Sequence, residues 1–387
     1  MKTITVRLRL LLLFIIFSFF VFTINVNSQI NARNEIKIPN ILGFTTLKCD
    51  FHIHTVFSDG SVWPTIRPQE VWLEGLDAFS ITDHIEYQPH KKDVPTNHNR
   101  SYELALPRAR EVNLIFIKGS EITRGEPPGH LNAIFLKDSN PLDTKDYRDA
   151  VKLAVEQGAF VFWNHPGWKQ PNLKAVFYKE QNELYKKGWL HGMEVVNGDD
   201  YYPEVHKWCL EKNLTMMGNS DIHNPINFNY NFQNGNHRPM TLVLAKEKSE
   251  NAIKEALFAH RTVVWDENVL IGEEKYLSPL FNESIEIKNP NITIRGKGRS
   301  YIQIYNKSDV SFELIAEGES KDITFPKNVT LYADKTVLLG ISVKSEKMAG
   351  KKGIQIPYQV QNLWIAPKKG LSIKLNIDVD YIPSDKK

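Results

Sequence analysis

Two histidines, His52 and His54, are separated by one residue at the end of an apolar run. Side chains two positions apart on a β-strand point to the same side of the strand, so both imidazoles can bind one metal ion. The pair alone is weak support for a metal site, because two solvated surface histidines explain it about as well. Asp59 adds a carboxylate in the loop that follows, and Gly60 permits a tight turn there.

Residues of ligand type also end or begin several other apolar runs. Taken singly, each has an ordinary explanation, because a histidine after a strand is more often a hydrogen-bonded surface or core residue and a carboxylate there is often a helix cap. Chance is a poor explanation for nine such residues on one face of a fold. We therefore predict nine metal ligands: His52, His54, Asp59, His84, Glu121, His130, His165, Asp221 and His223. Four further residues are candidates for orienting these imidazoles by hydrogen bonds: Asp50, Asp83, Asn164 and Asn219. Each could equally be a helix cap.

These residues need a scaffold that brings distant strand ends together. From Leu47 to about Trp265, short β-rich runs alternate with stretches long enough for helices, which is typical of a mostly parallel α/β sheet or barrel. The runs are Leu47–His54, Ala78–His84, Leu114–Ile122, His130–Leu136, Ala159–His165, Met193–Asn197 and Leu214–Asp221. The carboxyl ends of barrel strands and the loops after them form the active-site face, so we expect these endings to converge.

The pattern divides the chain into domains. A strand over Met240–Ala245 and a helix over Ser249–His260, with Ser249 as its cap, are predicted to complete an α/β barrel spanning residues 47–275. From Ser284 the residues alternate with a period of two and show no helical spacing, which predicts a small all-β sandwich over residues 284–387. Nothing in that second domain has the composition of a catalytic cluster.

The first residues predict export. Basic residues precede an apolar run from Leu10 to Ile24, the order of a secretory signal peptide, and we expect cleavage near Ser28. Residues 29–46 would then be a linker. An uncleaved membrane anchor is the competing interpretation, since the apolar run is close to the shortest length that spans a bilayer. We expect a periplasmic or extracellular protein without membrane attachment after cleavage.

Composition narrows the possible partners. The 387 residues include 48 basic and 45 acidic side chains, a formal net charge of +3. So small a charge, spread along the chain, gives no reason to expect a nucleic-acid partner. The two cysteines, Cys49 and Cys209, are too few for a disulfide framework and are expected to be buried apolar side chains.

The ordered motifs resemble those of the polymerase and histidinol phosphatase (PHP) superfamily. The matching segments are Asp-Phe-His-Ile-His-Thr at 50–55, Ser-Asp-Gly at 58–60, Ile-Thr-Asp-His at 81–84, Gly-Ser-Glu-Ile at 119–122, Gly-His at 129–130, Asn-His-Pro-Gly at 164–167 and Asn-Ser-Asp-Ile-His at 219–223. The match covers roughly residues 48–223 and extends loosely to 265. It implies a distorted (β/α)7 barrel that holds two or three divalent metal ions, and a metal-dependent hydrolase.

The resemblance also implies how the ligands divide. His52 and His54 would hold a first ion with Asp221, Glu121 would bridge it to a second ion held by His130 and His165, and the third ion would have the ligands Asp59, His84 and His223. Imidazole with carboxylate suits Zn, Mn or Fe. Close divalent ions lower the pKa of bound water, from 15.7 to about 7 in the zinc case, and stabilise charge on phosphoryl oxygens.

The expected reaction is hydrolysis of a phosphate monoester or diester, and export favours a phosphorylated small molecule or glycan as the substrate. Candidates for transferring the leaving-group proton are Asp83, Asp221 and His223. Candidates for binding phosphate are the cationic residues nearest the motifs, although each is more often a solvated surface charge: Arg124, Lys169, His237 and Arg238.

Two other functions stay open. An amidohydrolase-type enzyme that cleaves C–N or C–O bonds also begins with a His-x-His pair, but residues 133–137 offer no convincing bridging lysine at the expected site. In the second alternative, the barrel is an inactive metal-binding remnant and the β domain binds a glycan or a protein partner. The intact set of nine ligand positions disfavours that interpretation.

Overall fold

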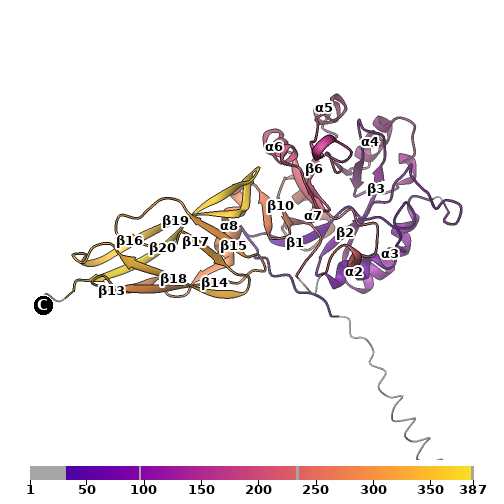
Figure 1. The fold of residues 1–387 in the computed structure, drawn as a ribbon. Coiled ribbons are helices and arrows are strands. Elements are labelled where there is room, and N and C mark those ends of the chain that lie inside the picture. The colour runs from indigo at the N-terminus through magenta and orange to yellow at the C-terminus, as the bar shows by residue number, and fades with distance from the viewer. Residues whose placement is uncertain (1–31, 96, 232–234, 385–387) are drawn as a thin grey trace, which may run out of the picture. The chain divides into compact units, whose positions relative to one another are not determined.

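The first part of the fold is a series of short strands joined by helices and long loops (Figure 1). The computed structural model describes residues 32–95, 97–231 and 235–384, so the predicted signal peptide, residues 1–28, lies outside the described residues. The strands of this part are β1 (Thr45–Asp50), β2 (Ala78–Ile81), β3 (Ile115–Ile122), β4 (Leu131–Ile134), β5 (Phe160–Trp163), β6 (Gly192–Asn197), β7 (Asp200–Tyr201), β8 (Thr215–Asn219), β9 (Met240–Ala245), β10 (Thr262–Asp266) and β11 (Val269–Gly272).

Helices pack outside these strands. They are α2 (Arg67–Leu73), α3 (Arg100–Glu111), α4 (Tyr147–Glu156), α5 (Lys179–Lys186), α6 (Pro203–Lys212), α7 (Glu250–Phe258) and α8 (Glu274–Ser284), with short 3-10 turns at Asn140–Leu142, Pro171–Leu173 and Ile226–Phe228. The helix expected after β9 is α7, and the Ser249 side chain accepts a hydrogen bond from Ala252 N, as its role of cap requires. Among the described residues, no helix combines the length and the apolar character that crossing a bilayer demands.

Strands β4 and β9 of the barrel are each antiparallel to both of their neighbours. The pairs β1–β2, β2–β3, β5–β6 and β6–β8 are parallel, whereas β4 is antiparallel to both β3 and β5. Because Leu131 at the start of β4 pairs with Ile122 and Trp163 at the ends of β3 and β5, the start of β4 lies on the active-site edge. The predicted α/β barrel is confirmed. The reversal of β4 explains why His130 precedes its strand, whereas Glu121 lies within β3 and the other predicted ligands follow strands.

Side-chain hydroxyls join the two ends of the sheet. Thr241 Oγ1 on β9 accepts a hydrogen bond from Gly218 N at 3.0 Å and donates to Gly218 O at 2.9 Å, on β8. Thr262 Oγ1 on β10 donates to Met216 O at 2.8 Å. A Cβ atom on Gly218 would lie 2.3 Å from Val264 Cγ1, so the close approach of β8 and β10 requires glycine.

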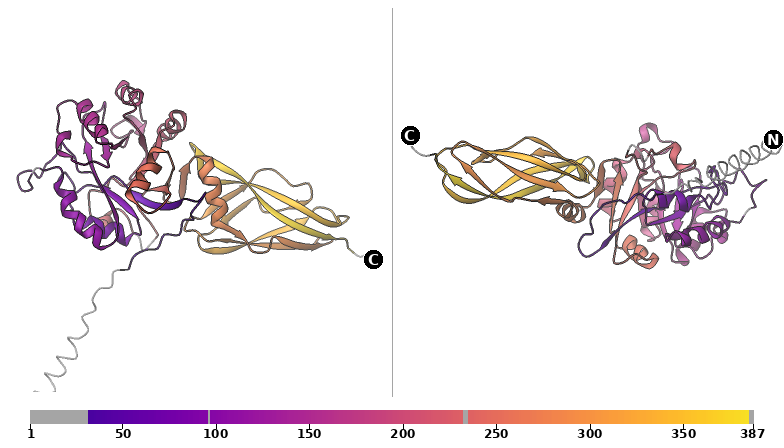
Figure 2. Two further views of the ribbon diagram at one scale, coloured as in Figure 1. Left: turned by 180° about the vertical axis from the view of Figure 1, so that it is seen from behind. Right: turned by 90° about the horizontal axis from the view of Figure 1, so that it is seen from below.

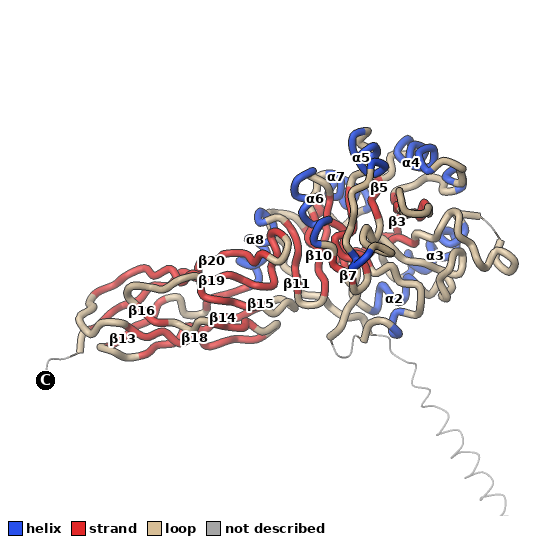
Figure 3. The backbone as a smooth tube through the Cα atoms, turned by 45° about the horizontal axis from the view of Figure 1, so that its top comes forward, coloured by secondary structure: helices blue, strands red, loops and turns tan. Residues whose placement is uncertain are grey.

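The second part of the fold is all β. Its strands are β12 (Ile285–Ile287), β13 (Asn291–Arg295), β14 (Arg299–Asn306), β15 (Phe312–Ala316), β16 (Ile323–Thr324), β17 (Asn328–Leu331), β18 (Lys335–Val343), β19 (Gly350–Ala366) and β20 (Lys369–Ile382). The views in Figure 2 show them as two layers, and Figure 3 shows strands and loops alone beyond α8 in the described residues. Alternate residues of β20 are buried, as in a half-buried strand. The predicted β sandwich is confirmed.

A single ladder continues from the barrel into the β domain. β19 pairs in parallel with β11, with Leu363 opposite Leu270 and Trp364 opposite Ile271. The Asn362 side-chain amide donates hydrogen bonds to Asn268 O and to Ser311 O. The barrel sheet therefore does not end at β11.

Candidate metal centre

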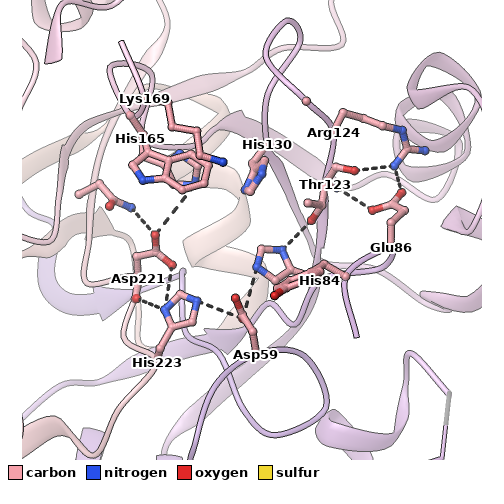
Figure 4. A pocket seen from close by; sticks show the side chains of 14 residues that line it. Asp59, His84, Glu86, Thr123, Arg124, His130, His165, Lys169, Asp221 and His223 are labelled. Atoms are coloured by element: carbon pink, nitrogen blue, oxygen red, sulfur yellow. Dashed lines mark hydrogen bonds and ion pairs between the residues drawn. The ribbon is translucent and has the colours of Figure 1, made fainter. Parts of the chain in front are cut away.

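The nine predicted ligands meet in one cluster beside a cavity of about 690 Å³, and those that line the cavity are labelled in Figure 4. Six of them line the cavity: Asp59, His84, His130, His165, Asp221 and His223. The other three, His52, His54 and Glu121, are fully buried. One side of the cluster is therefore buried in the protein and the other side faces the cavity. Its residues are spread over the sequence from position 52 to position 223.

Four donor atoms of the cluster, three from the buried residues and one from Asp221, lie close together. They are His52 Nε2, His54 Nε2, Glu121 Oε2 and Asp221 Oδ1, and five of the six distances among them lie between 3.0 and 3.3 Å. Four ligands at about 2.0–2.1 Å from a central ion, at the corners of a tetrahedron, are about 3.3–3.4 Å apart. His52, His54 and Asp221 therefore fit one divalent cation, and Glu121 Oε2 contacts the same two imidazoles.

The remaining ligands face the open side. Glu121 Oε1 lies 2.7 Å from His130 Nδ1 and 3.7 Å from His165 Nε2. Asp59 Oδ1 lies 3.1 Å from His223 Nε2 and 3.4 Å from His84 Nε2. His84 also reaches Glu121 Oε2, with its Nδ1 at 3.0 Å, so its imidazole stands between the second and third groups of ligands.

Three carboxylate oxygens in this cluster are buried without a well-formed hydrogen bond from any described residue: Asp59 Oδ1, Glu121 Oε1 and Asp221 Oδ1. A buried polar atom left in this state costs about 1–3 kcal/mol. A cation bound by these oxygens would remove that cost. The donor set of imidazole and carboxylate, without thiolate, suits Zn, Mn or Fe.

The electrostatics of the cluster favour positive charge. Burial by itself lowers the pKa of His84, but the charge of Glu121 and contacts with Asp59 and Glu121 outweigh it and raise that pKa to about 10. Burial likewise opposes a charged His52, yet the charges of Asp221, Glu194 and Glu121 raise its pKa well above the usual value. A site that binds protons so firmly is one where divalent cations would be stabilised in their place.

Glu194, on β6, holds two of the ligands in position. Its Oε1 accepts a hydrogen bond from His52 Nδ1 at 2.8 Å, and its Oε2 accepts from His165 N at 2.7 Å. Asn219 and Asn197 side chains donate to the two oxygens at 2.9 and 2.8 Å. Because His52 Nδ1 donates, its Nε2 carries the lone pair that an ion needs. Glu194 was not among the predicted site residues.

Arg67, at the start of α2, joins two ligand-bearing segments and was also not predicted. It is fully buried. Its guanidinium donates hydrogen bonds of 2.7 to 3.1 Å to His54 O, Glu70 Oε2, Ile222 O, His223 O and Asn224 O. These bonds tie the end of the His52–His54 segment to the loop that carries Asp221 and His223.

The residues proposed for proton transfer occupy different positions. Asp221 and His223 line the cavity, whereas Asp83 is absent from its lining among the described residues. Asp83 accepts 2.7 Å hydrogen bonds from Thr55 N, Thr55 Oγ1 and Ser58 Oγ, and Ser58 Oγ lies 3.2 Å from His54 Nδ1. Asp83 therefore shapes the loop after His54 and does not line the cavity.

Two ligands adopt a backbone conformation that side chains disfavour. The φ angles are +29° at His165 and +52° at Asp221. Positive φ is uncommon for residues other than glycine, and it persists where the surrounding structure holds it. Both residues follow the end of a barrel strand, where the chain turns sharply to present the side chain to the cavity.

The four cations proposed for phosphate binding divide into two pairs. Arg124 and Lys169 line the cavity and lie on opposite sides of it, with His130 between them (Figure 4). Arg238 is fully buried and donates to Asp50 Oδ2 at 2.9 Å and to Glu74 Oε2, away from the cavity. His237 is bonded to the carbonyl groups of Arg238 and Glu267. The structure thus brings only the first pair, among the described residues, to the metal centre.

Comparisons with known proteins agree with this architecture. A family model described as an Ig-like domain matches residues 285–376. No curated protein matches the chain. A solved two-domain protein from Bacteroides vulgatus, which contains a predicted PHP-like metal-dependent phosphoesterase, is 46% identical over 89% of this chain and 99% of its own, with a TM-score of 0.85. A proposed metal-dependent phosphoesterase from Bifidobacterium adolescentis is 16% identical over 54% of this chain and 95% of its own, and its TM-score of 0.38 is too low to support an inference.

Proposed function

Because this chain belongs to the PHP-like metal-dependent phosphoesterases, in their two-domain form, we propose that it hydrolyses a phosphate monoester or diester with two or three divalent ions held by the nine-residue cluster. The observation that carries the proposal is the set of 3.0–3.3 Å distances among His52, His54, Glu121 and Asp221. Zn, Mn and Fe are the ions that the ligands suit.

The position of each residue in the cavity suggests its role in the reaction. When bound, divalent ions at such a site make water more acidic and offset negative charge on phosphoryl oxygens. His223 Nδ1 donates to Asp221 O at 2.7 Å, so His223 Nε2 keeps its lone pair for an ion or a proton. Asp221 Oδ1 faces His52 and His54, and Asp221 Oδ2 lies 3.4 Å from Asn197 Nδ2 at the cavity wall. We assign the leaving-group proton to His223. Burial opposes a charged His223, but its contacts with Asp59 and Asp221 outweigh burial and raise its pKa. Burial likewise opposes a charged Asp221, yet the charges of His52 and His54 keep the pKa of Asp221 far below its usual value.

An amidohydrolase-type reaction lacks support in the structure. β4 (Leu131–Ile134) contains no lysine, and Glu121 from β3 stands between the ligand groups. A remnant without activity is disfavoured by the same geometry, because an inactive barrel has no reason to keep nine donors in contact.

The substrate proposal extends the prediction of export. The N-terminal residues predict export, and an exported enzyme would meet a phosphorylated small molecule or glycan outside the cytoplasm. We expect the mature protein, isolated from the cell fraction outside the cytoplasmic membrane, to begin near Gln29 when its N-terminus is sequenced. A chain that keeps Met1 and remains in the membrane fraction would contradict this expectation.

The activity is tested by elemental analysis of the purified protein together with phosphate release from a panel of monoesters and diesters. We expect release that stops on chelation and returns with added metal. His54→Ala should lose metal and at least ~100-fold of the activity, since it removes a ligand from the buried side of the cluster. His90→Ala, in an exposed loop, is the matched control. Bound metal without release from any ester would refute the phosphoesterase.

A further inference from the structure

Two large aromatic side chains stand exposed at the rim of the metal cavity. Trp168 and Tyr87 line it and are 42% and 52% exposed. The Trp168 ring lies 5.1 Å from the ring of His165 and 5.3 Å from that of His130, and Tyr87 lies 5.9 Å from His84. Aromatic side chains normally gain stability by burial, so apolar rings beside charged ligands call for an explanation.

The exposure of Trp168 is imposed by its loop. Pro166 and Gly167 are buried, and a Cβ atom on Gly167 would lie 2.2 Å from Leu173 O and 2.6 Å from Tyr202 Cε1. Trp168 N donates to His165 O at 2.9 Å, which closes a turn directly after the ligand. The loop therefore has no space to turn inward, and its backbone presents the indole to the cavity.

A cation accompanies this indole. Lys169 Nζ lies 3.8 Å from the centre of the Trp168 ring, a cation–π contact. No carboxylate of the described residues forms an ion pair with Lys169, in contrast to Arg124, which pairs with Glu86 and donates to Thr144 O. Lys169 is thus held at the cavity by the ring and keeps its charge available to an anionic ligand.

We infer that the group esterified to the phosphate carries a ring with a flat apolar face, which stacks on Trp168 while Lys169 contacts an anionic oxygen of the substrate. The inference rests on the proposed function, because the ring belongs to the leaving group of the ester. Hydrolysis breaks the P–O bond to that group, joins the oxygen of water to phosphorus and returns a proton to the leaving oxygen. The ring is unchanged, and no further reactant is required.

The first test compares esters with and without a ring. Trp168→Leu should raise the KM for phenyl phosphate roughly three- to tenfold, the size of one stacking contact, with kcat within about twofold. The KM for glycerol 2-phosphate should not change. Glucose 6-phosphate distinguishes the source of the ring: a larger effect on it than on phenyl phosphate identifies a sugar, and the reverse identifies an aromatic group. Tyr332→Leu, an exposed aromatic residue of the β domain, is the control.

A binding test separates this inference from the activity. Phenylphosphonate and methylphosphonate, which are not esters, should differ at least threefold in Kd for the native metal-loaded protein, and the difference should vanish in Trp168→Leu. Equal affinities in the native protein, or a KM change shared equally by ring and ringless esters, would overturn the inference. If no ester is hydrolysed but phenylphosphonate still binds through Trp168, the proposed reaction fails and the ring site stands. Metal content and circular dichroism verify that each variant is folded.

Discussion

Glu194 fixes the orientation and the tautomer of His52, one of the predicted metal ligands. It accepts four hydrogen bonds, from His52 Nδ1, His165 N and the amides of Asn197 and Asn219. A glutamine at this position would replace one accepting oxygen by an N–H₂ group. Because the partners of Glu194 are themselves hydrogen-bond donors, that N–H₂ group could not bond to them. The imidazole of His52 would then lose the partner that fixes its tautomer.

We expect Glu194→Gln to weaken metal binding by about 10–100-fold, the usual cost of losing such a partner. Competition with a chelator of known affinity measures this directly. Glu211→Gln, on the exposed face of α6, should leave the affinity unchanged. An unaltered affinity in Glu194→Gln would mean that His52 keeps its tautomer without the carboxylate.

The ligand types could be predicted from the sequence, whereas the residues that orient them largely could not. The nine donors stand beside recognisable strand ends, but Glu194 lies within an apolar run and was treated as part of a strand. A carboxylate among Met193 and Val195 was nevertheless a signal, because a buried charge must have partners. Arg238 shows the opposite error. Arg238 is near the site in sequence and was therefore proposed to bind phosphate. In the fold it pairs with Asp50 and Glu74, which lie far from it in sequence.

At the scale of secondary-structure elements, α2 stabilises the metal centre through one side chain. Arg67 bonds to carbonyl groups on both sides of the ligand cluster and to Glu70 in its own helix. Glu70 in turn accepts a hydrogen bond from Ile226 N at 3.0 Å. The spacing of His54 and His223 therefore depends on a residue that touches neither imidazole.

Replacing Arg67 by Met should leave these carbonyl groups and Glu70 unpaired in the interior, at a cost of about 3–5 kcal/mol. We expect fewer bound ions per chain and an altered absorption spectrum of the cobalt-loaded protein. The milder Glu70→Gln should show the same spectral change with smaller destabilisation, in case Arg67→Met does not fold. Arg100→Met, an exposed residue at the start of α3, is the control. Native metal content and spectrum in both variants would contradict a positioning role.

The direction of β4 could not be predicted from its sequence. Apolar runs of four residues such as Leu131–Ile134 fit a parallel and an antiparallel strand equally well, because residue pattern encodes burial and not direction. The position of His130 before its run was the available sign. In a uniformly parallel barrel this residue would lie at the opposite end from His165, and the two could not share an ion.

At the scale of the whole molecule, buried neutral histidines make stability depend on pH. His206, on α6, is fully buried with its Nδ1 3.0 Å from Tyr201 OH. Burial lowers the pKa of His206 to about 4, against about 6.5 in an unfolded chain. The unfolded state therefore binds more protons between these values, so this contribution to stability is present above pH 6.5 and is lost as the pH falls towards 4.

Between pH 7 and pH 5 this single group should reduce the free energy of unfolding by about 2 kcal/mol. Urea unfolding of His206→Gln at the two pH values should show a pH-dependent loss smaller by that amount than in the native protein. His90→Gln, in an exposed loop, should retain the native pH dependence. The same loss in all three proteins would assign the acid sensitivity to other groups, the metal ligands first among them.

The ladder between β11 and β19 gives the β domain a role that does not depend on any ligand. Without β19, β11 would present an unpaired row of amide and carbonyl groups at the border of the barrel, and such borders recruit strands from other molecules. We expect one calorimetric transition for both domains, with equal calorimetric and van 't Hoff enthalpies; two separated peaks would contradict this. The Ig-like domain would then act as a built-in guard against aggregation, keeping the catalytic barrel soluble by completing its sheet.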